Sequence, residues 1–90
     1  MSQILSTEHH GDHEVHFKIS NPFPAAQSAR YDSRDAAGDD ALARSLFLVM
    51  GIRSVRLDAD TITIERDPQV IWPLIIPPAV NIISSKIKNM

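Results

Sequence analysis

Four histidines near the start of the chain are the residues whose type and spacing could bind a metal ion. His9, His10, His13 and His16 fall within eight residues, and carboxylate side chains stand beside them. Imidazole is the commonest transition-metal ligand in proteins, and short histidine-rich tracts bind metals, although this spacing matches no standard zinc motif. We treat His9, His13 and His16 as candidate metal ligands. The alternative is a polar loop leading into a strand with exposed imidazoles.

The rest of the sequence offers no recognisable catalytic arrangement. The chain contains no cysteine, which excludes a thiol nucleophile, a disulfide and thiolate ligation of zinc or an iron–sulfur cluster within this chain. We find no glycine-rich phosphate loop and no nucleophile–base pair. The carboxylates of Asp58 and Asp60 flank an expected hairpin turn, whose chemistry explains them. The sequence therefore predicts a non-enzymatic protein with no catalytic residues and no cofactor.

Length and composition predict one globular domain over residues 1–90. A chain of 90 residues buries only a modest core and does not divide it, and 43% hydrophobic residues suffice to form one. The net charge of −2 gives no general attraction to nucleic acid or to anionic lipid. The first residues lack a basic region followed by an apolar run, and no stretch reaches the ~18 apolar residues of a membrane span. We therefore expect a cytoplasmic protein that binds neither nucleic acid nor membrane.

A helix is predicted over about residues 40–50. Its apolar residues recur at the spacing of one helix face: Leu42, Leu46, Phe47, Val49 and Met50. Asp39 and Asp40 suit the N-cap, because a carboxylate accepts hydrogen bonds from the free backbone N–H groups there. Gly51 suits the left-handed position that ends a helix. We expect the apolar face of this helix to cover a sheet.

Strands are predicted on both sides of this helix. Alternation of apolar and polar residues over about 53–58 and 61–66 predicts a central antiparallel hairpin. The same alternation predicts a strand over 14–20, and residues 3–7 and 29–33 are candidates for shorter strands. These segments predict an α+β fold, a small two-layer sandwich with helices packed on one face of an antiparallel sheet of about three to five strands.

The last segment, about residues 69–88, is predicted to be helical. Apolar residues at helical spacing predict a buried face with a tryptophan as its largest member: Trp72, Ile75, Ile76, Ala79, Ile83 and Ile87. Pro77 and Pro78 lack the backbone donor that a helix interior needs. We therefore expect two helical pieces, about 69–76 and 78–88.

Apolar side chains off that face form a candidate partner surface: Leu74, Pro78, Val80 and Ile82. Large exposed apolar surface is unusual on a small monomer and marks interaction sites. Two interpretations remain open. Either the irregular N-terminal part buries these residues, or they contact a second copy of the chain or another protein.

Short sequence blocks over about residues 40–85 carry a family resemblance. In order, they are LARSLF at 42–47, GIRSV at 51–55, DTITI at 60–64, and Trp72 followed by Pro77. Their order and spacing resemble the N-terminal domain of the Nfu/NifU-like scaffold proteins of iron–sulfur cluster assembly, which reads PLAR-x-LF, G-V/I-x-x-V, D-F-I-T-V and W-x-x-L-x-P. Ile76 and Pro78 depart from this family, because they stand where it commonly has charged residues.

The resemblance implies a small α+β domain, in agreement with the periodicity. In this family the cluster is held by a separate C-terminal domain with a C-x-x-C pair, and this chain lacks that pair. The resemblance therefore implies an accessory, protein-interaction module that assists iron–sulfur cluster assembly or delivery. The expected partner is an iron–sulfur scaffold or carrier protein, or a second copy of the chain. The alternative function is a small metal-binding protein that uses His9, His13 and His16.

Overall fold

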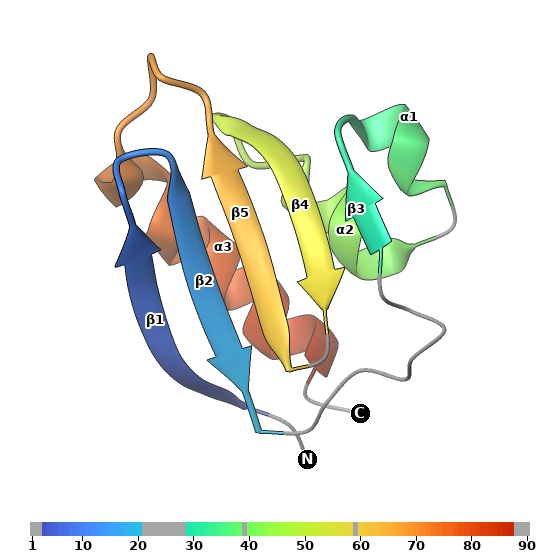
Figure 1. Ribbon diagram of the computed structural model, residues 1–90. Helices are drawn as coiled ribbons and strands as arrows, with labels where there is room; N and C mark the ends of the chain where they lie inside the picture. The colour runs from blue at the N-terminus through green and yellow to red at the C-terminus, as the bar shows by residue number, and fades with distance from the viewer. Residues whose placement is uncertain (1–2, 21–28, 39, 59, 88–90) are drawn as a thin grey trace.

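In the computed structural model, which describes residues 3–20, 29–38, 40–58 and 60–87, the chain forms a five-stranded antiparallel sheet with helices on one face (Figure 1). The strands are β1 (Ile4–His10), β2 (Glu14–Ile19), β3 (Ala29–Tyr31), β4 (Ile52–Asp58) and β5 (Thr61–Arg66). The helices are α1 (Arg34–Ala37), α2 (Ala41–Leu46) and α3 (Trp72–Ile87). The predicted α+β fold is confirmed.

The strand order is β1-β2-β5-β4-β3, and each neighbouring pair is antiparallel. The β4–β5 hairpin has the predicted alternation, with Val55 opposite Ile64 and Leu57 opposite Ile62. On the other side of β5, Val15 of β2 lies opposite Ile64. Because residues that lie opposite each other share a face, these apolar side chains form rows across the sheet.

The core lies between these rows and the helices α2 and α3. Side chains without solvent exposure come from both layers: Val15, Phe17, Val55, Ile62 and Ile64 from the sheet, and Leu46, Ile75, Ala79, Ile83 and Ile87 from the helices. On α3 the buried residues recur every four positions and so form one face. Fully burying a large apolar side chain contributes about 1.5–3 kcal/mol, so this face holds the helix on the sheet.

Helix α3 is continuous over Trp72–Ile87, so the prediction of two helical pieces is wrong. Pro77 and Pro78 lie inside it, and each removes the N–H that would bond to the carbonyl group four residues earlier, at Pro73 and Leu74. Pro73, Leu74 and Pro77 are exposed and Pro78 is half-buried. Water can therefore hydrogen-bond the freed carbonyl groups, and the buried face of the helix contains no proline.

Helix α2 ends at Leu46 and is shorter than predicted. The chain continues in tight turns, in which the N–H groups of Leu48 and Val49 donate to carbonyl groups three residues back, at 3.1 and 3.0 Å. These turns bury Val49 but expose Leu48 and Met50. Met50 is therefore not part of the predicted core face.

Asp40 begins α2 and also joins it to β3. Its Oδ1 accepts a hydrogen bond from the N–H of Ala43 at 3.1 Å, as expected of an N-cap. The hydroxyl of Tyr31 donates to Oδ2 at 3.2 Å. Burial, and then this carboxylate, raise the pKa of Tyr31 above its usual 10.0, because both disfavour the phenolate. The other cap candidate, Asp39, and residue 88 at the expected end of α3 lie outside the described residues.

We expect Tyr31 to make the folded protein less stable above about pH 10. The raised pKa means that the folded chain keeps the phenol proton to a higher pH than the unfolded chain does. The contribution of this group to stability is full below the unfolded pKa and is lost as the pH rises through the folded pKa. In Tyr31→Phe this loss is absent, so its urea-unfolding midpoint should approach that of the wild type as the pH rises.

The single tyrosine of the chain makes this prediction easy to check. Phenolate absorbance of the native protein reports the pKa of Tyr31 directly. A native-state titration midpoint at or below that of the urea-unfolded chain would contradict the prediction.

Candidate interaction site on the open face of the sheet

The structure separates the three histidines predicted as metal ligands. His9 lies opposite a buried residue of β2 and so on the helix-facing side, where its ring centroid is 5.8 Å from that of Trp72. His16 lies on the other side of the sheet, and its Nε2 is 3.2 Å from Oε1 of Glu14. His13 lies in the turn between β1 and β2. The sheet itself therefore stands between His9 and His16.

Two histidines do contact each other, but one of them, His10, is not among the candidate ligands chosen from the sequence. The ring of His10 stacks on the ring of His16, with centroids 3.8 Å apart. Within the part of the chain that the structure describes, no group of three or more histidine or carboxylate side chains is placed to hold a metal ion. The geometry thus does not favour a metal site formed by His9, His13 and His16, and that site remains a prediction.

The residues predicted as a partner surface lie on two flanks of α3. Leu74, Pro78 and Ile82 recur every four residues along one flank, whereas Val80 lies on the other side of the buried Ala79. Leu74 is 64% exposed, and the other three predicted residues are half-buried. Val80 and Ile82 pack against the core. Much of the expected apolar surplus is therefore buried, and Leu74 is the member that remains on the surface.

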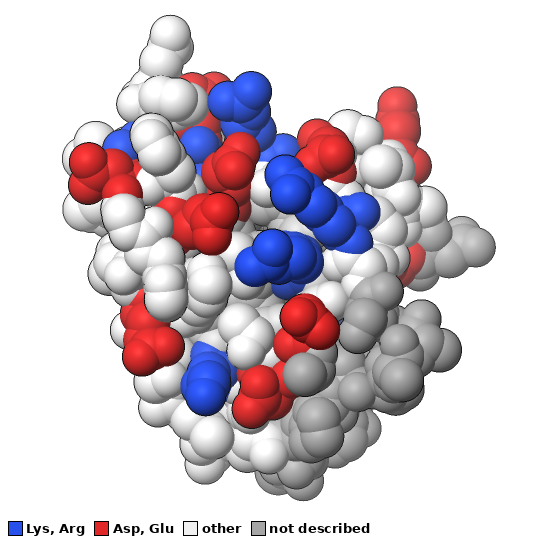
Figure 2. Space-filling view, viewed as in Figure 1, with Lys and Arg blue, Asp and Glu red and all other residues white. Residues whose placement is uncertain are grey.

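The face of the sheet opposite the helices carries polar side chains from alternate positions of its strands. On β2, β4 and β5 these are Glu14, His16, Lys18, Ser54, Arg56, Asp58, Thr61, Thr63 and Glu65. None of the described helices covers this open face (Figure 1). Figure 2 shows the same face, with basic side chains gathered over β3 and β4 and acidic side chains beside them. One solvated face is common in antiparallel sheets, so the distinguishing feature is the placement of the charges.

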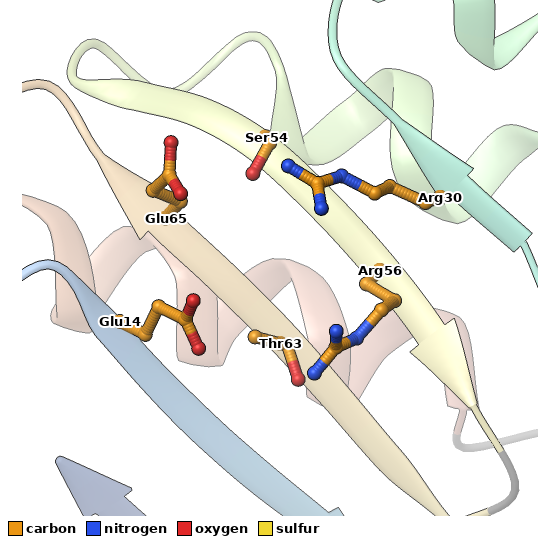
Figure 3. Close-up of a pocket in the computed structure, with 6 residues that line it drawn as sticks. All are labelled: Glu14, Arg30, Ser54, Arg56, Thr63 and Glu65. Atoms are coloured by element: carbon orange, nitrogen blue, oxygen red, sulfur yellow. The ribbon is translucent and has the colours of Figure 1, made fainter. Parts of the chain in front are cut away.

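Side chains of like charge lie directly opposite each other at two places on the open face. Arg30 of β3 is opposite Arg56 of β4, and Glu14 of β2 is opposite Glu65 of β5. Like charges in this position destabilise a sheet. A hollow of ≈ 20 Å³ lies between the two pairs (Figure 3), lined by Glu14, Arg30, Ser54, Arg56, Thr63 and Glu65. The hollow therefore has an acidic end and a basic end.

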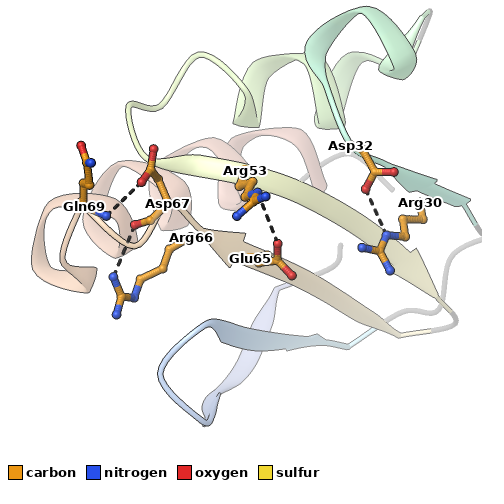
Figure 4. Close-up of polar contacts among 7 residues, drawn as sticks. All are labelled: Arg30, Asp32, Arg53, Glu65, Arg66, Asp67 and Gln69. Atoms are coloured by element: carbon orange, nitrogen blue, oxygen red, sulfur yellow. Dashed lines mark hydrogen bonds and ion pairs between the residues drawn. The ribbon is translucent and has the colours of Figure 1, made fainter.

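Neighbouring side chains contact both glutamates at the acidic end of the hollow. Glu14 contacts His16 as described above, and Oε1 of Glu65 lies 3.9 Å from Nε of Arg53 (Figure 4). Arg53 lies at the irregularity in the pairing of β4 with β5, beside Glu65. Each glutamate thus has its own basic neighbour.

The positive charge at the basic end of the hollow is less fully balanced by neighbouring carboxylates. Nε of Arg30 donates to Oδ1 of Asp32 at 3.2 Å, but both side chains are largely exposed, and exposed ion pairs contribute little. Arg56 makes no hydrogen bond or ion pair with any residue in the described ranges. The two opposed arginines therefore leave a net positive charge at this end.

Arg66, at the end of β5, joins two segments of the chain. Its Nε donates to the carbonyl of Asp12 in the β1–β2 turn at 2.6 Å. Its Nη1 lies 3.3, 3.1 and 3.1 Å from the carbonyl oxygens of Asp67, Pro68 and Val70, which lead into α3. Figure 4 shows this side chain turned toward Asp67. The planar guanidinium thus reaches both segments at once.

Replacing Arg66 with lysine should lower the free energy of unfolding by about 1–2 kcal/mol. An ammonium group keeps the charge, but it is a single point and cannot reach the carbonyl of Asp12 and those before α3 together. Urea unfolding measures the loss. Arg44→Lys is the matched control, because Arg44 is exposed and unpaired among the described residues. Equal stability of the two variants would contradict a structural role for Arg66.

The fold and this site define the class of protein: a small α+β domain with one face of its antiparallel sheet covered by helices and the other open and charged. The family model for "Scaffold protein Nfu/NifU N terminal" matches residues 6–90, and the chain belongs to this family. The resemblance inferred from the sequence blocks is thereby confirmed. Comparison with curated proteins gives no match.

Solved structures show the same fold. The crystal structure of protein SAV1430 from Staphylococcus aureus has a TM-score of 0.77 at 18% identity, covering 90% of this chain and 98% of that one. The solution structure of SAV1430 has a TM-score of 0.69 at 18% identity, covering 89% and 88%. A Staphylococcus epidermidis protein solved by NMR has a TM-score of 0.57 at 20% identity, covering 93% and 98%. At these identities the likeness concerns the fold alone.

A membrane span would need a longer apolar helix than any found in the described residues.

Proposed function

We propose that this chain is a non-enzymatic protein-interaction module that assists iron–sulfur cluster assembly or delivery. The observation that carries the proposal is family membership over residues 6–90. The cluster is the cargo of the partner, because the chain has no cysteine to supply thiolate ligands. The partner is an iron–sulfur scaffold or carrier protein, and a cytoplasmic location without nucleic-acid or membrane binding belongs to the same proposal.

The open face of the sheet supports a role in contact. Its hollow offers two arginines, two glutamates and two hydroxyl groups, which are groups that recognise another surface through charge and hydrogen bonds. Complementary charge across a protein interface contributes mainly to specificity and to the rate of association. A module that receives or presents a cluster-bearing partner needs both.

The test is a calorimetric titration of the purified chain into a cysteine-bearing iron–sulfur scaffold protein from the same organism, with and without its cluster. Anaerobic incubation of the chain alone with iron and sulfide runs beside it. We expect saturable binding to the scaffold and no stoichiometric iron or sulfide on the chain alone. Light scattering on the same sample determines whether the chain is a monomer or a homodimer. Absence of binding to the scaffold, or a cluster held by the chain alone, would overturn the proposal.

A further inference from the structure

We propose that the basic end of the open-face hollow, between Arg30 and Arg56, binds a carboxylate side chain from an acidic segment of a partner protein. The segment would lie across the open face of the sheet. The inference rests on the proposed function in one respect only, which is that the partner is a protein.

The first argument is the opposition of the two arginines. Arg30 and Arg56 are paired residues on neighbouring strands, which run about 4.8 Å apart. Their charges repel in the free protein, and Asp32 is the one described carboxylate in contact with either. An oxyanion between the two guanidinium groups would replace this repulsion by two charge-assisted contacts. Figure 3 shows both side chains extending from β3 and β4 over the hollow.

The second argument is the pair of hydroxyl groups in the hollow. Ser54 and Thr63 are 9% and 6% exposed, yet neither side chain makes a hydrogen bond with a residue in the described ranges. Their hydroxyl oxygens are open to solvent, because neither is among the fully buried polar atoms that lack a partner in the described residues. Figure 3 shows both hydroxyl groups between the arginines and the glutamates. They are therefore available as further donors to an oxyanion held by Arg30 and Arg56.

The third argument concerns which oxyanion fits. The hollow is open to solvent and small, at ≈ 20 Å³, so the head of one side chain fits it better than a nucleotide does. Glu14 and Glu65 at the other end repel a doubly charged phosphate more strongly than a singly charged carboxylate. A planar carboxylate also matches the fork of a guanidinium group. The same two glutamates suit a basic residue on the segment that supplies the carboxylate.

The test is an NMR titration at low ionic strength, where exposed charges are least screened. The probes are a capped peptide of alternating serine and glutamate, the same peptide with glutamine in place of glutamate, and inorganic phosphate. We expect the glutamate peptide to shift the signals of Ser54, Arg56 and Thr63 saturably, and the glutamine peptide not to do so.

Two substitutions locate the binding. Arg56→Gln should weaken the glutamate peptide about tenfold or more, since it removes a charge-assisted hydrogen bond. Its thermal midpoint should not fall, because the substitution also removes a like-charged neighbour of Arg30. The matched control is Arg44→Gln, which removes an exposed arginine on α2 and should leave the affinity unchanged.

Several outcomes would overturn the inference. Tighter binding of phosphate than of the peptide identifies a free-anion site instead, and equal weakening by Arg56→Gln and Arg44→Gln identifies unspecific attraction. If Arg56→Gln fails to fold, Arg30→Gln takes its place. Repeating the scaffold titration with Arg56→Gln separates this inference from the proposed function. If the scaffold binds this variant as tightly as the wild type, the function stands and the carboxylate site is wrong.

Discussion

Replacing Gly51 with alanine should lower the free energy of unfolding by about 3 kcal/mol, from backbone strain and overpacking together. Gly51 has a φ of +100°, which side-chain-bearing residues rarely adopt. A Cβ there would lie 2.6 Å from Cγ1 and 2.7 Å from Cβ of Val70. Rotation of the Val70 side chain cannot move its Cβ, so the whole segment before α3 must shift. That segment also donates a 2.7 Å hydrogen bond from the N–H of Asp67 to the Gly51 carbonyl.

Two other glycines separate the contribution of backbone strain from that of overpacking. Gly11 and Gly38 also have positive φ values, of 69° and 56°, but an added Cβ meets nothing within 4 Å at either position. Gly11→Ala and Gly38→Ala therefore report backbone strain alone. Urea unfolding of all three variants should place Gly51→Ala lowest in stability. If it is no less stable than the other two, the close approach to Val70 contributes nothing.

Gly51 also shows what local sequence can and cannot predict. Its position after an apolar run predicts a positive φ, and this is correct. The predicted reason was the end of a helix over about residues 40–50, whereas the helix ends at Leu46 and Gly51 instead leads into β4 and packs against Val70. The contact with Val70 joins segments far apart in the sequence. No pattern within either segment reveals it.

The elements that were predicted correctly are those whose pattern is local. Strict alternation placed β2 and the β4–β5 hairpin to within a residue or two, because each strand has one face toward the core. Helix α1 was missed, since a four-residue helix capped by Ser33 leaves no periodic signal. The continuity of α3 was missed because Pro77 and Pro78 break a helix by local rules. The helical spacing places both prolines off the buried face, but only the structure shows that the helix continues past them.

The features of the candidate site likewise divide into those that a local pattern predicts and those that it does not. In the predicted hairpin, polar residues alternate with apolar ones. This alternation indicates that Ser54, Arg56 and Thr63 face away from the core. The opposition of Arg56 and Arg30 depends on β3 packing beside β4, after two intervening helices, and has no local signal. The histidines show the opposite error, in which residues close in the sequence were expected to lie close together in space. Strand β1 extends through His10, so residues close in the sequence were divided between the two faces of the sheet.

Truncating Ile83 to alanine should cost about 3–4 kcal/mol, the loss expected for a fully buried aliphatic side chain. Ile83 has no solvent exposure and lies midway along the buried face of α3. Its removal leaves a cavity between α3 and the sheet, and the surrounding rows of strand side chains cannot close it. In a domain of 90 residues such a loss is a large share of the stability. Chemical denaturation with a far-ultraviolet signal measures it.

Leu74→Ala is the matched control, because it removes the same number of carbon atoms from the same helix. Leu74 is 64% exposed, so its truncation should change stability by less than about 0.5 kcal/mol. The two variants therefore separate the two roles of α3. If Leu74 belongs to a partner surface, its variant keeps wild-type stability but binds the scaffold more weakly. If instead Leu74→Ala destabilises the protein as much as Ile83→Ala does, this flank of α3 is part of the core, and the assignment of Leu74 to a partner surface is wrong.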